Sequence, residues 1–99
     1  MPNNDYPKPK DGGVAVGAYL RAMREAAGIS VKDLAEKIGA DNTAIWRIEA
    51  WKSDSRSSVL LKFVCAVRAS ADDVVLLMNN PDATREDGER LAHLRTGIR

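Results

Sequence analysis

The stretch VKDLAEKIGADNTAIWRIEA, residues 31–50, decides the fold. Its apolar residues recur at helical spacing, and Gly39 at its centre can adopt the positive backbone angle of a tight turn. The pattern predicts two short helices, 31–38 and 42–50, and a connection of only three residues makes such helices cross sharply. Ala35 is small enough for the close approach. The expected inward positions are Leu34, Ile38, Ile45 and Ile48.

Helix start and stop signals extend this pattern in both directions. Ser30 is a favourable N-cap with Asp33 three residues later, and Gly28 before it can end a preceding helix. The same order of residues recurs at Ser70 and Asp73. An all-α fold class follows, because the apolar residues nowhere alternate strictly. Five helices are expected, at about 14–27, 31–38, 42–50, 58–68 and 71–78.

The two ends of the chain differ in composition from the helical part. Residues 1–13 hold three of the four prolines and almost nothing apolar, which predicts a flexible arm. Residues 79–99 begin with Asn-Asn-Pro and are rich in charge, so they form either a weak sixth helix or a disordered tail. The expected organisation is therefore an arm, a helix-turn-helix domain over 14–78 and a short charged tail.

Composition argues against several classes of function. One cysteine, Cys65, excludes an internal disulfide, and with His93 as the one histidine no zinc cluster can form. Asp72 and Asp73 are better explained as first-turn partners of a helix dipole than as an acid–base pair. Neither a phosphate-binding glycine loop nor an apolar run of about 20 residues is present. We expect a cytoplasmic protein that is no enzyme, needs no metal or cofactor and enters no membrane.

The outward face of the helix 42–50 carries the candidate function. At about 100° per residue, the side chains opposite Ile45 and Ile48 fall within about 140°. They offer an amide, a hydroxyl, an indole and a guanidinium, and amide and guanidinium groups can pair bidentately with adenine and guanine edges. Trp46 has two alternatives, a place in a dimer contact or partial burial by Arg47 and the arm. Arg47 has an alternative as a solvated side chain. The candidate base contacts are Asn42, Thr43, Trp46 and Arg47.

Residues 17 to about 76 resemble the Cro and phage-repressor (XRE-type) helix-turn-helix family, small five-helix DNA-binding proteins of bacteria and phages. The resemblance covers about three fifths of the chain. It implies a lambda-repressor-like fold that places the helix 42–50 in the major groove of DNA. The candidate phosphate contacts are Ser30, Lys32, Lys37, Lys52 and Arg56. The matching residues are Leu20, Met23, Arg24, Gly28, Ile29, Ser30, Leu34, Ala35, Ile38, Gly39, Ile45, Arg47, Ile48, Glu49 and Lys52.

The resemblance also implies one structural ion pair, and three residues depart from the family pattern. Arg24 lies in the apolar stripe of the first helix, where a charge needs a partner, and the resemblance suggests Glu49. Val31 stands where a phosphate-binding glutamine is common, and Trp46 replaces a small or polar residue. Trp51 stands where a turn glycine is common; because tryptophan at a positive φ is strained, we expect this helix to end differently here.

The expected function is a sequence-specific DNA-binding transcriptional regulator, a repressor of the phage-immunity or antitoxin type. Its partner would be a double-stranded operator with an inverted repeat, read by a homodimer whose contact comes from 71–78 or from the tail. A protein antagonist or a cognate toxin is a possible further partner. The alternative is a non-enzymatic protein-interaction module that uses the same face, favoured by the net charge of only +1 and by two tryptophans.

Overall fold

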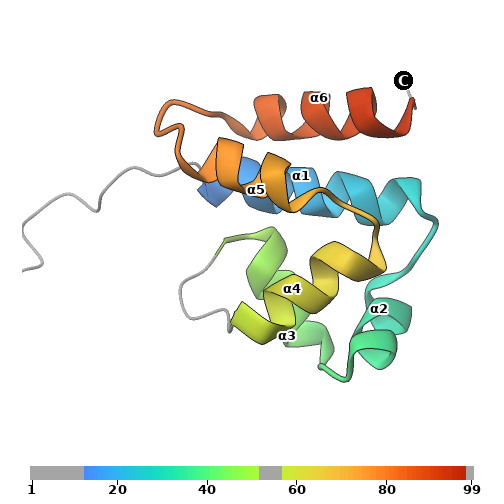
Figure 1. Ribbon diagram of the computed structural model, residues 1–99. Coiled ribbons are helices and arrows are strands. Elements are labelled where there is room, and N and C mark those ends of the chain that lie inside the picture. Colours follow the sequence, from blue (N-terminus) through green and yellow to red (C-terminus); the bar gives the residue numbers. More distant parts are fainter. Residues whose placement is uncertain (1–12, 52–56, 98–99) are drawn as a thin grey trace, which may run out of the picture.

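The computed structural model describes residues 13–51 and 57–97. Within these ranges the secondary structure is entirely helical, which confirms the all-α class (Figure 1). No helix there is long and apolar enough to cross a membrane, and no three potential ligands among His, Cys, Asp and Glu gather into a metal site. The helices are α1 (Gly13–Ala26), α2 (Val31–Ile38), α3 (Asn42–Glu49), α4 (Ser57–Ala66), α5 (Ala71–Met78) and α6 (Arg85–Thr96).

Side chains cap the first turn of most of the helices. The Ser30 hydroxyl oxygen accepts a hydrogen bond from the Asp33 backbone N–H at 3.0 Å, as the sequence predicts. Asp41 does the same for α3, its carboxylate accepting from the Ala44 N–H at 2.8 Å. Gly39 ends α2 with φ 72°, and its N–H donates to carbonyls of the last turn. These local contacts fix where α2 ends and α3 begins, and so fix the crossing of the two helices.

Helix α1 is the centre of the molecule. In Figure 1 α6 lies along one side of α1, while α2, α3 and α4 lie on the other side. The inward residues of α2 and α3 are buried as predicted, together with side chains from α1 and α4. The largest fully buried side chains are Tyr19, Phe63, Leu20, Leu34, Ile45, Ile48 and Val16.

The tail contains a packed sixth helix. Of the two alternatives for residues 79–99, the structure shows the helix, and it is not a weak one. Ala92 is fully buried, and a Cβ added to Gly88 would overlap the carbonyl oxygen of Ala15 in α1. The spacing of large apolar residues predicted at most a weak helix here. It did so because the contact with α1 depends on small residues, which allow the two backbones to approach closely. Figure 1 shows α6 running beside α1 along its whole length.

A partly buried polar network fastens α6 to α1 and α5. Arg95 donates two hydrogen bonds of 2.8 Å to the Asp73 carboxylate, which lowers the pKa of Asp73. The buried Tyr19 hydroxyl donates to the same carboxylate at 2.8 Å and accepts from the Ser70 N–H at 3.0 Å. Burial raises the pKa of Tyr19 to about 12. Asp73 is therefore more than a helix-dipole partner, because it joins three helices.

Helix boundaries differ from the expectations at the ends of α3 and α4 and at the start of α1. Trp51 follows α3 with φ 53°, so the helix ends in the left-handed conformation that we expected tryptophan to avoid. Its indole packs against Gly13 and the edge of the core, which offsets the backbone strain. Arg68 after α4 also has a positive φ, 58°. Gly13, assigned to the arm, instead opens α1; the rest of the arm lies outside the described residues.

Candidate nucleic-acid interface

The outward side of α3 presents four neighbouring exposed side chains. They stand opposite the buried Ile45 and Ile48, which anchor α3 to the core. Trp46 is 58% exposed although tryptophan is usually buried, so this face displays a large aromatic surface. The structure thus brings all four candidate base contacts to one surface: Asn42, Thr43, Trp46 and Arg47.

The candidate phosphate contacts are only partly described. Ser30, Lys32 and Lys37 are exposed on α2 and at its N-cap. The Ser30 hydroxyl oxygen accepts from the Asp33 N–H, but its proton remains available for a phosphate oxygen. The N-terminus of α3 is less favourable for an anion, since the Asp41 carboxylate occupies it. Lys52 and Arg56 lie outside the described residues.

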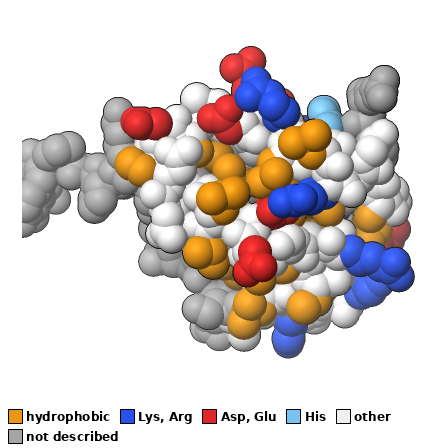
Figure 2. Space-filling model, turned by 45° about the horizontal axis from the view of Figure 1, so that its top comes forward, with side chains coloured by type: hydrophobic (Ala, Val, Ile, Leu, Met, Phe, Trp, Pro, Cys, Tyr) orange, Lys and Arg blue, Asp and Glu red, His pale blue; other side chains and the backbone are white. Residues whose placement is uncertain are grey.

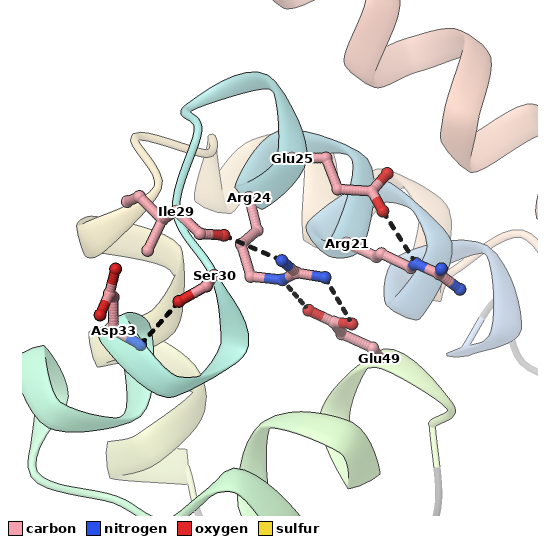
Figure 3. A network of polar contacts seen from close by, with 7 residues as sticks. All are labelled: Arg21, Arg24, Glu25, Ile29, Ser30, Asp33 and Glu49. Carbon is pink, nitrogen blue, oxygen red and sulfur yellow. Dashed lines mark hydrogen bonds and ion pairs between the residues drawn. The ribbon is translucent and has the colours of Figure 1, made fainter.

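Arg24 and Glu49 form the ion pair expected between the first and third helices (Figure 3). The Arg24 Nε atom donates to one carboxylate oxygen at 2.6 Å and Nη2 to the other at 3.3 Å. Nη1 donates to the Ile29 carbonyl oxygen at 2.8 Å, in the turn before α2. The two side chains are only 11% and 9% exposed. One guanidinium therefore ties together α1, the turn before α2 and the end of α3.

A groove of about 460 Å³ runs beside the exposed face of α3. Trp46 and Val31 form part of its wall, and the Arg24–Glu49 pair lies against it. Helix α6 contributes Arg85 and Glu89 to the lining, so the groove joins α3, α1 and α6. Its remaining lining residues are Val14, Ala18, Arg21 and Ala50.

Sequence reasoning missed the part of this surface that lies outside the helix-turn-helix unit. Arg21, Arg85 and Glu89 line the same groove as Trp46, yet nothing in their local sequence marks them as neighbours of α3. The signal is tertiary, because it depends on α6 docking along α1. A helical wheel of a single segment contains no such information.

Comparison with known proteins agrees with this geometry. The chain is 43% identical over 79 residues to an uncharacterized 15.4 kDa protein in the HgiDIIM 5' region of Herpetosiphon aurantiacus. That match covers 80% of this chain and 57% of the relative, so the chain spans little over half the relative's length. The crystal structure of the clp gene regulator ClgR from C. glutamicum is similar, with a TM-score of 0.59 and 26% identity. The structural match covers 73% of this chain and 94% of the ClgR chain. The model of the helix-turn-helix domain family matches residues 15–77, and the chain belongs to that family.

Proposed function

We propose that this protein is a sequence-specific DNA-binding transcriptional regulator that docks α3 in the major groove of its operator. The observation that carries the proposal is the exposed row of polar and aromatic side chains on α3, held outward by buried Ile45 and Ile48. The similarity to the solved regulator of clp genes supports a role in gene regulation. A regulator of this kind acts in the cytoplasm of a bacterial or phage-infected cell.

The proposed division of labour follows from side-chain chemistry. Asn42 and Arg47 read base edges through bidentate hydrogen bonds, and Thr43 and Trp46 add contacts with methyl groups and sugars. Phosphate contacts then set the register on the duplex without adding sequence information. They come from Ser30, Lys32, Lys37, Lys52 and Arg56.

Selection from a random duplex library tests this proposal. At roughly 0.15 M salt, nonspecific attraction to phosphates is already weakened, so an enriched motif reports base recognition. Asn42→Ala and Arg47→Ala are expected to cost about 1–3 kcal/mol each on that motif and to relax specificity at one position. Glu36→Ala, an exposed change on α2, is the matched control. If both variants keep the parent's motif and affinity, this assignment of α3 is wrong.

The protein is proposed to bind an inverted repeat as a homodimer. A single module of this size buries limited DNA surface, so two copies on half-sites about one turn apart raise the affinity. Val75, Leu76 and Leu94 are 56–72% exposed on α5 and α6. Figure 2 turns this side forward and shows hydrophobic side chains spread between charged ones. Sedimentation should show a dimer that Leu94→Asn weakens and Leu61→Asn on α4 does not; a monomer with and without DNA contradicts this part.

Repression is the proposed direction of control, because a small domain that occupies a promoter can block it without further machinery. A protein antagonist or a cognate toxin that lifts the repression fits the phage-immunity or antitoxin type. A reporter gene behind the selected operator measures the direction. Rising expression on co-production of the regulator contradicts repression.

A protein-interaction module is the second candidate function. It is favoured by Trp46, which is exposed as protein-interface anchors are, and by the net charge of only +1. If the folded protein enriches no DNA motif while Trp46→Ala abolishes capture of a partner, this candidate replaces the first.

A further inference from the structure

The groove beside α3 is built only in part by the helix-turn-helix unit. The family model ends at residue 77, whereas Arg85 and Glu89 lie on α6. Because Gly88 brings α6 close to α1 and Arg95 binds Asp73 of α5, these two side chains have a defined place beside the groove. The chain therefore carries a surface next to α3 that α6 contributes.

This surface is continuous with the candidate base-reading face. Trp46 belongs to both, since it is exposed on α3 and also lines the groove. The lining also includes Val31 at the start of α2 and Arg85 at the start of α6. A polymer seated against Trp46 can thus contact α2, α1 and α6 along one path.

The charges along this path favour an anion by a small margin. Arg24 and Glu49 neutralise each other in their buried pair. Arg21 contacts Glu25 at 3.3 Å, but these side chains are 63% and 55% exposed, so the contact holds Arg21 only weakly (Figure 3). Arg85 forms no ion pair within residues 13–51 and 57–97. Apart from the buried pair, the residues that line the groove therefore carry two guanidinium groups, Arg21 and Arg85, and one carboxylate, Glu89.

A helix in the major groove has a sugar–phosphate strand along each side, so side chains beside it meet phosphates rather than base edges. We propose that Arg85, assisted by Arg21, binds phosphates of the DNA strand that passes the Trp46 side of α3. The interface then extends from the helix-turn-helix unit onto α6. This inference rests on the proposed DNA binding and adds to it a contact that is independent of sequence.

The salt dependence of DNA binding tests the inference. Each phosphate contact contributes about 0.9 to the slope of log affinity against log salt. Between about 0.05 and about 0.2 M salt, the affinity ratio of parent to Arg85→Gln should therefore fall by about 3.5-fold. Arg90→Gln is the matched control, since Arg90 lies on the same helix, is exposed, forms an ion pair with Asp87 and is not among the residues that line the groove. The motif selected from a random library should be the same for all three proteins.

The Glu89→Gln variant should change the DNA affinity in the opposite direction. Removing this carboxylate reduces repulsion of the phosphate, so affinity should rise at low salt and converge with the parent at high salt. Thermal melting of each variant checks that α6 stays docked. Two outcomes overturn the α6 contact while leaving binding by α3 in place. One is an equal salt slope for the parent, Arg85→Gln and Arg90→Gln; the other is an equal affinity of Glu89→Gln and the parent at low salt. A parent protein that binds no duplex overturns the proposed function itself.

Discussion

Replacing Arg24 by alanine tests how strongly the buried ion pair with Glu49 stabilises the fold. The change removes both contacts with Glu49 and the hydrogen bond to the Ile29 carbonyl oxygen. It leaves the Glu49 side chain, 9% exposed, without its cation. Breaking a buried pair in this way costs about 3–5 kcal/mol, because the remaining charge stays desolvated. For a domain whose whole stability is about 5–15 kcal/mol, this is a large fraction.

Urea unfolding followed by circular dichroism measures this free energy of unfolding. A loss of about 3 kcal/mol should also lower the Tm by about 12 °C or more in a domain of this size. Arg21→Ala is the control, because its pair with Glu25 is exposed and contributes less than about 1 kcal/mol. The double variant Arg24→Met with Glu49→Leu should regain most of the loss, since matched apolar residues can replace a buried pair.

Two results would contradict the role of the Arg24–Glu49 pair. If Arg24→Ala unfolds within about 1 kcal/mol of the parent, the pair does not hold α1 and α3 together. If the double variant is no more stable than Arg24→Ala, the loss does not come from the charge left on Glu49. Arg21→Ala must stay close to the parent in either case, because its ion pair is open to water.

The remaining predictions concern helix ends and the docking of α6. Arg68→Gly should raise the Tm by a few degrees, because a positive φ costs an arginine about 1 kcal/mol; an unchanged or lower Tm in a thermal melt contradicts this. Gly88→Val should destabilise the protein by about 2 kcal/mol or more and speed hydrogen exchange in α6, because a Cβ there overlaps the Ala15 carbonyl oxygen. Parent-like exchange would show that α6 does not need this close approach. Arg95→Gln should be less stable at pH 7, and its deficit should shrink as the pH falls below 3.8. The folded-state pKa of Asp73 lies below that ordinary value, so the contact stabilises the protein only while Asp73 is charged. A deficit that is the same in acid contradicts an electrostatic role.

Local signals in the sequence account for the helix-turn-helix unit. The Ser30 cap, the turn at Gly39 and the inward isoleucines of α3 can all be predicted, because each depends on residues at most four positions apart. Arg24 and Glu49 could be paired because a charge in an apolar stripe demands a partner and the family resemblance suggested which one. These features also bring the exposed face of α3 to the surface.

The features that could not be predicted depend on contacts between distant residues. Trp51 adopts a positive φ against its local preference, because its indole packs on Gly13 at the other end of the unit. The docking of α6 depends on small residues and on Asp73, which is 22 positions away from Arg95. Local propensity predicts backbone conformation poorly where tertiary packing opposes it, as it does at Trp51 and in α6.

Helix α1 links the two parts of the proposed interface. On one side Gly17 lets α1 meet the α3 backbone, since a Cβ there would overlap the Glu49 carbonyl oxygen. On the other side Gly88 lets α6 meet α1 at Ala15. Both contacts are between backbones, which leaves little freedom for α3 and α6 to move independently. The side chains of Trp46 and Arg85 therefore project from one rigid body, and a DNA strand that meets the first is offered the second at a fixed separation.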